Sequence, residues 1–169
     1  MKKLFARIGA WFRRLLAEKA IVVPKPPNIP DNGVYISVSE AKAIITATLG
    51  DRMISHSHIH MADGEYYCPS VEYVEHLLEQ DLLDRMQYAA ESFDCDDYAF
   101  VLKARFCLDA YKHGERRSAH CAGFVWGRLP HPHAMNWVIT DDKVLRLIEP
   151  QNDLWQDWGE EFSIWLMAA

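Results

Sequence analysis

The hydrophobic pattern is strongest after Asp94, where the chain stays apolar almost all round for several turns. Asp94 is a good N-cap because its carboxylate can accept the free backbone N–H groups of a first turn, and Asp97 stands where negative charge suits the positive helix end. A helix with so narrow a polar stripe is mostly buried, and Gly114 is placed to end it. The pattern therefore predicts a buried helix with Cys95 in its first turn.

Two segments of alternating polarity, His133–Thr140 and Val144–Gln151, predict an antiparallel hairpin joined by residues 141–143. A two-residue loop would move Arg146 onto the face of Trp137, so we favour the three-residue loop, which gives the cleaner apolar face. The usual glycine at the third loop position is missing. In the favoured register one face carries His133, Met135, Trp137, Ile139, Leu145, Leu147, Glu149 and Gln151.

That face ends in a polar cluster. Glu149 lies diagonal to His133 and Gln151 lies opposite it, both within side-chain reach. A buried face that ends in His and Glu is hard to explain by packing alone. If the Cys95 helix covered this face, thiol and imidazole would meet.

Other segments give the remaining elements. Ser37–Glu40 is a capping box that opens a helix ended by Gly50, and Cys68–Ser70 leads into another helix. Residues 119–126 are strand-like. The large apolar residues after Asn152 recur at roughly helical spacing and are expected to be core rather than a ligand platform: Trp155, Trp158, Phe162, Trp165 and Leu166.

The first residues form a basic amphipathic helix, followed by a proline-rich linker. We therefore divide the chain into residues 1–20, a linker at 21–33 and a catalytic domain at 34–169. The helix is predicted to lie on an anionic membrane surface or in the groove of a partner protein, the alternative being that it packs on its own domain. Its binding side chains are Phe5, Ile8, Trp11, Phe12 and Leu15.

Charge and cysteine content narrow the class of protein. Residues 1–19 carry a net charge of +5 within a chain whose total is −6, so the rest of the chain carries −11. An acidic body argues against a nucleic-acid partner. The four cysteines have no CxxC spacing and indicate free thiols in a reducing compartment. We therefore expect a cytoplasmic protein, with residues 2–19 as the means of peripheral membrane attachment.

Cys95, His133 and Glu149 suit nucleophilic chemistry on an acyl group. The imidazole would take the thiol proton, and the carboxylate would hold the imidazole in the correct tautomer. His120 and His131 are rivals for the base. The backbone N–H of Cys95 could stabilise an oxyanion, and the supporting polar residues around the site are Gln87, Gln151 and Asn136.

An alternative centre is a metal site. His56, His58 and His60 alternate and would share one face of a strand, where three imidazoles could hold a metal. No Cys or carboxylate at matching spacing completes that set, so a metallohydrolase is the weaker reading of the chain.

The segments Phe93–Ala99, His133–Trp137 and Ile148–Gln151 resemble the papain-like and transglutaminase-like thiol enzymes. Within that group the likeness is to the C-terminal cysteine-protease domain of mushroom agglutinins and to related small bacterial and phage proteins. The resemblance implies an α+β fold, in which a central helix with Cys at its N-terminus packs on an antiparallel sheet that carries His and Glu. It also implies calcium-dependent activity, which would make Asp96 and Asp97 cation ligands.

The resulting functional hypothesis is a thiol hydrolase that cleaves a peptide or amide bond in a protein or peptide substrate through an acyl-enzyme formed on Cys95. The alternatives are acyl transfer by the same triad, as in transglutaminases, and a non-catalytic inhibitor or adaptor that binds its partner through the N-terminal helix. Nothing in the residues themselves requires a cofactor, and calcium enters only through the resemblance.

Overall fold

The computed structural model describes residues 32–52, 58–113, 116–129, 131–159 and 161–169. The predicted N-terminal helix and nearly all of the linker lie outside the described residues. None of the helices in the described part of the chain combines the length and the hydropathy that a membrane span needs.

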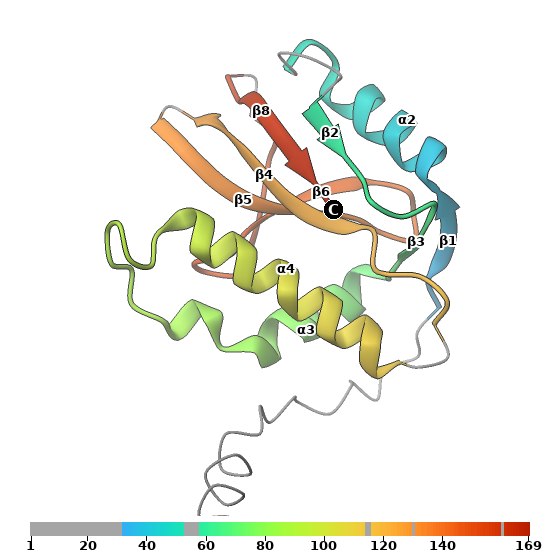
Figure 1. Ribbon diagram of the computed structural model, residues 1–169, viewed down its shortest axis with the longest axis horizontal. Coiled ribbons are helices and arrows are strands. Elements are labelled where there is room, and N and C mark those ends of the chain that lie inside the picture. The colour runs from blue at the N-terminus through green and yellow to red at the C-terminus, as the bar shows by residue number, and fades with distance from the viewer. Residues whose placement is uncertain (1–31, 53–57, 114–115, 130, 160) are drawn as a thin grey trace, which may run out of the picture.

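The described residues are mostly sheet, with a few helices (Figure 1). A small antiparallel sheet pairs β1 (Val34–Ser37) with β3 (Glu65–Cys68). A six-stranded sheet runs in the order β2-β8-β4-β5-β6-β7. Its strands are β2 (Ile59–His60), β8 (Ser163–Ala168), β4 (Ala122–Leu129), β5 (His131–Ile139), β6 (Leu145–Glu149) and β7 (Leu154–Gln156).

The helices begin where the capping residues predicted. Helix α2 (Val38–Leu49) starts after Ser37, whose hydroxyl accepts the Glu40 N–H, and it ends at Gly50. Helix α3 (Val71–Asp81) starts after Ser70, and α4 (Cys95–Lys112) starts after Asp94. Two short 3-10 turns complete the set, η1 (Gly50–Arg52) and η3 (Leu83–Arg85).

The hairpin register is confirmed. Trp137 pairs with Leu147 across β5 and β6, as the three-residue loop requires. Lys143 stands at the third loop position, where glycine is usual, and adopts a left-handed φ of 60°. Loop length and the cleaner apolar face were therefore enough to set the pairing.

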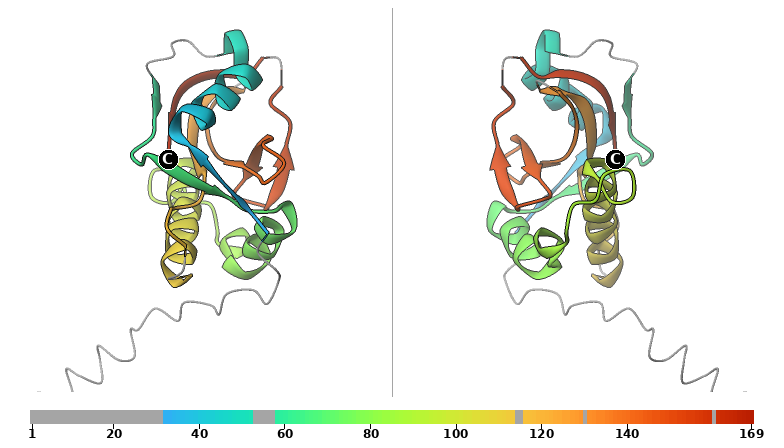
Figure 2. Two further views of the ribbon diagram at one scale, coloured as in Figure 1. Left: turned by 90° about the vertical axis from the view of Figure 1, so that its right-hand side faces the viewer. Right: turned by 90° about the vertical axis from the view of Figure 1, so that its left-hand side faces the viewer.

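The two faces of the large sheet carry separate cores, and α4 covers the face that we did not expect (Figures 1 and 2). Trp137 and Leu147 pack with α2 and the small sheet, whereas Val138 and Ile148 pack with α3 and α4. The prediction that the Cys95 helix covers the face of His133 is wrong. The face of Val138 and Ile148 is also apolar, so alternation alone did not decide which helix covers which face.

Helix α4 is less uniformly buried than its sequence indicates. Phe93 and Tyr98 bracket its start with ring centroids 4.5 Å apart and form a hydrophobic staple. Phe100 is 41% exposed. Asp109, which with Arg105 and Lys112 makes up the narrow polar stripe of the sequence, is buried. The polar stripe is therefore not the solvent face, because Asp109 has buried partners that are distant in sequence.

The segment after Asn152 forms strands rather than a helix. Strand β8 buries Ile164 and Met167, which are three positions apart, and leaves Trp165 37% exposed. Its register against β4 shifts between Trp126 and Gly127. Phe162 is core, as expected, but Trp165 is not. The segment contains too few large apolar residues for their spacing to distinguish a helix from two short strands separated by a break.

Candidate functional site

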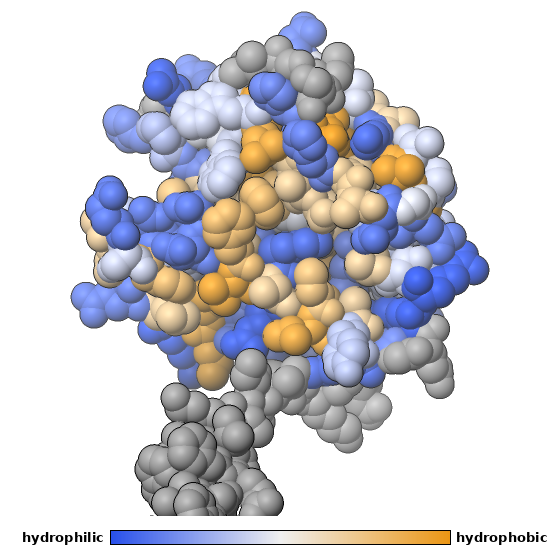
Figure 3. Space-filling view, viewed as in Figure 1, coloured by the Kyte–Doolittle hydropathy of each residue, from blue (hydrophilic) through white to orange (hydrophobic). Residues whose placement is uncertain are grey.

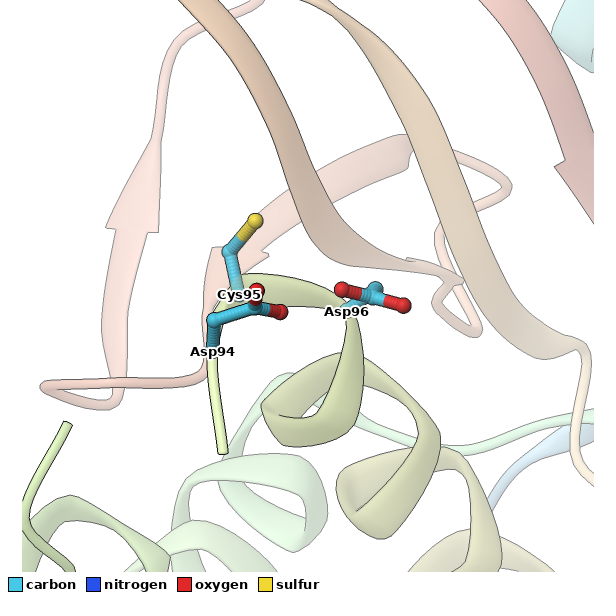
Figure 4. Close-up of side chains that lie close together, drawn as sticks. All are labelled: Asp94, Cys95 and Asp96. Carbon is cyan, nitrogen blue, oxygen red and sulfur yellow. The ribbon is translucent and has the colours of Figure 1, made fainter. Parts of the chain in front are cut away.

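The Cys95 thiol lies at the start of α4, next to strand β5. Its sulfur points away from the helix (Figure 4), and the Ala134 N–H donates a hydrogen bond to it. Asp94 is the N-cap residue, and the Asp97 carboxylate accepts the Asp94 N–H at 3.3 Å. The capping interactions thus fix the position of the thiol at the helix end.

His133 and Glu149 form a direct pair. His133 Nε2 lies 2.6 Å from Glu149 Oε2, which confirms the predicted proximity of the two side chains. The second carboxylate oxygen accepts the Gln151 N–H at 3.2 Å, so Glu149 is held from two sides. Because Glu149 takes Nε2, the ring nitrogen left for other partners is Nδ1.

Cys95 and His133 share the lining of an open cleft of about 380 Å³. The cleft lies where the start of α4 meets β4, β5 and β8, and most of its lining is apolar or aromatic. The complete lining is Cys95, Asp96, Trp126, Pro132, His133, Trp165 and Leu166.

Electrostatics do not favour a thiolate at this position. Burial raises the pKa of the Cys95 thiol, and the charges of Asp94 and Asp96 raise it further, while the hydrogen bond from Ala134 opposes the shift. The hydrogen bond with Asp94 also raises the pKa of the Asp96 carboxyl. The helix end therefore does not by itself activate the thiol, because burial and then the flanking carboxylates outweigh it.

These acidic side chains could hold a cation. Within the described residues, Asp94, Cys95 and Asp96 place their ligand atoms within 4.8 Å of one another. The predicted ligands were Asp96 and Asp97, but Asp97 is engaged with the Asp94 backbone. A calcium ion here stays a prediction.

The supporting residues are not gathered at the cleft. Gln87 lies in an exposed segment outside the lining, and Gln151 contacts Glu149 only through its backbone. Asn136 is fully buried and donates to the Ala99 and Gly123 carbonyls, so it ties α4 to the sheet. An oxyanion role for Asn136 has no support in this geometry.

The other histidines are placed elsewhere. His120 is buried and bonds Asp109 at 2.7 Å, and His131 is exposed outside the cleft lining. His56 lies outside the described residues, and His58 bonds the Trp165 carbonyl. The three-histidine metal site is thus not supported by what the structure describes.

Two aromatic residues of the cleft were missed as site residues. Trp126 lies on β4 and Trp165 on β8, and Trp126 pairs with Leu166 across these strands. Figure 3 shows hydrophobic side chains gathered where α4 meets the strands above it. Phe100 and Phe124 extend this cluster, with ring centroids 4.8 Å apart.

Comparisons with known proteins give the family and the fold. A model of the family described as "Agglutinin C-terminal" matches residues 66–154. Two solved structures have a TM-score of 0.70 and 19% identity and cover 80% of this chain: one named "PSL1a-E64 complex" and one of Polyporus squamosus lectin bound to Neu5Acα2-6Galβ1-4GlcNAc. The match covers 51% and 49% of those chains, so this chain spans about half their length. A comparison with curated protein sequences finds no relative.

These findings correct the assignment made from the motifs. The fold is that of two solved structures, one of them named as a lectin, so the papain-like or transglutaminase-like fold class and the cysteine-protease identity are wrong on this comparison. Peptide or amide hydrolysis, acyl transfer and a peptide substrate are set aside with them. The motifs misled because a short Cys-Asp-Asp signature and the order Cys, His, Glu predict which side chains meet, not which ligand they meet.

The residues predicted to bind a membrane or a partner lie outside the described residues. The three residues predicted as the triad, Cys95, His133 and Glu149, all fall inside the matched segment. Since that segment covers more than half of the 169 residues, the chain belongs to the agglutinin C-terminal family.

Proposed function

We propose that this chain binds a glycan in the cleft at Cys95. The proposal rests on the lining of one open cleft, in which Trp126 and Trp165 occur together with the polar side chains of Asp96 and His133. A pyranose ring presents an apolar C–H face that stacks on indole, and its hydroxyls bond carboxylate and imidazole groups such as those of Asp96 and His133. Sites for small ligands are usually largely apolar clefts that contain a few polar groups.

The solved structures are consistent with a glycan as the ligand class, but they are not the main argument for it. One of them is a lectin named with a sialylated trisaccharide, and at 19% identity the likeness shows the fold alone. Because this chain spans only half of that protein, the composition of the cleft is the argument for a glycan here.

The test is glycan binding by the full chain. We would measure Neu5Acα2-6Galβ1-4GlcNAc by calorimetry and a wider set of glycans on an array. Trp165→Ala removes one stacking surface and should weaken binding by about tenfold or more, since an aromatic contact in a binding site contributes on the order of 1–3 kcal/mol. Tyr111→Ala is the matched control, because Tyr111 is 84% exposed and lies four turns along α4.

Binding lost in Trp165→Ala and kept in Tyr111→Ala is the expected result. A wild-type chain that binds no glycan on the array would overturn the proposal. Equal loss in both variants would show that the cleft is not the site.

A second proposal concerns the reactivity of Cys95 alone and not bond cleavage. We infer that Cys95, His133 and Glu149 act as nucleophile, base and orienting acid toward an electrophilic ligand. The observations that favour it are the 2.6 Å pair of His133 and Glu149 and the shared cleft. One similar structure is also named as a complex with E64.

E64 is therefore the probe for the thiol. The expected result is an increase in the intact mass equal to the compound, located on Cys95 and absent in Cys95→Ala. His133→Ala should slow the reaction while leaving glycan binding measurable. An unchanged mass after prolonged exposure would exclude a reactive thiol in this cleft.

Localisation stays a proposal. We propose from the cysteine pattern that the chain is cytoplasmic, and from the charge pattern that residues 2–19 attach it to an anionic membrane or a partner protein. Binding of the full chain, but not of a chain lacking residues 1–31, to vesicles containing phosphatidylserine is the result that would support it.

A further inference from the structure

Two of the four cysteines are neighbours across paired backbone segments. Tyr67 of β3 and His120, which precedes β4, form a parallel bridge. The Tyr67 N–H donates to the Ala119 carbonyl at 2.8 Å, and the Tyr67 carbonyl accepts the Cys121 N–H at 2.6 Å. Parallel pairing advances by one residue on each segment, so the next residues, Cys68 and Cys121, lie opposite each other.

The side chains of the two cysteines lie on the same side of this bridge. Successive side chains alternate between the two faces of a paired segment. The Tyr67 and His120 rings contact each other on one face, with centroids 5.8 Å apart. Cys68 and Cys121 are both fully buried in the core that contains Trp137. A hydrogen bond between their thiols agrees with the backbone register.

This spacing suits a disulfide. Paired backbones lie about 4.8 Å apart, and a disulfide spans Cα separations of about 4.4–6.8 Å. The other two cysteines do not meet this condition with each other. Cys95 and Cys107 both belong to α4 and are separated by about 18 Å along its axis. Cys107 is also exposed, whereas Cys68 and Cys121 are enclosed together.

We propose that Cys68 and Cys121 form a disulfide when the chain folds under oxidising conditions, and that they remain a buried thiol pair in a reducing compartment. The bond would join β3 to the residue that precedes β4 and close a loop that contains α3 and α4. Closing a long loop stabilises the native state mainly by restricting the unfolded chain. The inference does not depend on the ligand proposed for the Cys95 cleft.

The oxidant is a low-molecular-weight disulfide such as oxidised glutathione, which reaches the two thiols before folding buries them. One cysteine thiolate attacks a glutathione sulfur, forms a mixed disulfide and releases one glutathione thiolate. The second cysteine thiolate attacks the cysteine sulfur of the mixed disulfide and releases the other glutathione. In total the two cysteine thiols lose two protons and two electrons, and one oxidised glutathione becomes two reduced glutathione molecules.

Burial then preserves the state reached during folding. The hydrogen bond with Cys68, followed by burial, raises the pKa of the Cys121 thiol, although the charge of Lys103 opposes the shift. A protonated and inaccessible thiol exchanges slowly because the thiolate is the reactive form. The folded thiol pair therefore exchanges only when this part of the core opens.

The experiment refolds the reduced, denatured full chain in a mixture of oxidised and reduced glutathione, and in parallel with reduced glutathione alone. Remaining thiols are blocked with N-ethylmaleimide in denaturant, and the digested chain is read by mass spectrometry. Oxidative refolding should give peptides joined through Cys68 and Cys121, and reductive refolding should give four labelled cysteines. The crosslinked chain should unfold at a temperature higher by about 5 °C or more.

Cys68→Ala and Cys121→Ala should each abolish the joined peptides and the effect of oxidation on the unfolding temperature. Cys107→Ala is the matched control, because it removes an exposed thiol and should keep both. Four labelled cysteines after oxidative refolding, or disulfides only at other cysteines, would refute the proposal. A crosslinked chain that unfolds no higher than the reduced chain would refute it as well, because the native pairing would then not accommodate the bond.

Discussion

At the scale of single residues, a nucleophile's position does not decide its reactivity. Cys95 sits at the N-terminus of α4, where the helix end favours a thiolate. Burial and two flanking carboxylates shift its pKa the other way. Whether the thiol reacts near neutral pH therefore depends on what neutralises Asp94 and Asp96.

We predict that Cys95 titrates above the ordinary thiol value of about 8.5. Iodoacetamide labelling across pH, read by peptide mass spectrometry, measures the apparent pKa of each cysteine. Asp96→Asn removes one of the charges that raise the pKa and should lower it. Asp51→Asn, an equal change at an exposed position distant in sequence, should leave it unchanged. An apparent pKa below 8.5 in the wild-type chain would contradict this account.

At the scale of elements, one buried ionic network joins α3, α4 and the segment before β4. Tyr73 donates to Asp109 at 3.0 Å, His120 bonds it at 2.7 Å and Arg116 pairs with it at 3.0 Å. Burial by itself would raise the pKa of the Asp109 carboxyl. The hydrogen bond and charge of His120, together with Tyr73 and Arg116, outweigh burial, so the pKa lies below its ordinary value. The ionised carboxylate thus stabilises the contact between elements.

Asp109→Asn should lower the free energy of unfolding at pH 7 by about 3–5 kcal/mol, because it breaks a buried pair and leaves a charge uncompensated. The wild-type stabilisation is present above the unfolded pKa of about 3.9 and is lost as pH falls through the lower folded pKa. Urea unfolding between pH 7 and pH 2.5 should therefore show a steeper acid loss in the wild type than in Asp109→Asn. Parallel curves would exclude this role for Asp109.

At the scale of the whole molecule, β8 completes the large sheet from the far end of the chain. It lies between β2 and β4, and its pairing brings Trp165 to the Cys95 cleft. Gly123 permits this approach, since a Cβ there would lie 1.8 Å from the Ala168 carbonyl oxygen and 2.8 Å from the Trp137 ring. Close contact at one glycine thus supports both the sheet and the cleft.

We predict that Gly123→Ala destabilises the chain by about 3 kcal/mol, at the upper end of overpacking costs, because the contact is with backbone that cannot move aside. Gly64→Ala is the control, since nothing lies within 4 Å of its Cβ position, and it should change stability by less than about 0.5 kcal/mol. Chemical denaturation measures both. Equal stability of the two variants would show that β8 can shift without cost.

The sequence alone was sufficient for features that depend on neighbours along the chain. The helix starts after Ser37, Ser70 and Asp94, and the pairing of Trp137 with Leu147, followed from capping residues, alternation and loop length. The contact of His133 with Glu149 followed in turn from that register. These interactions span few residues, so local chemistry specifies them.

Only the tertiary structure decided which face of the sheet α4 covers, that residues 163–168 form a strand beside β4, and that Trp126 and Trp165 line the cleft. Both sheet faces are apolar, and a strand's partner can lie anywhere in the chain. The outcome therefore depends on packing of the whole molecule, which no local pattern encodes.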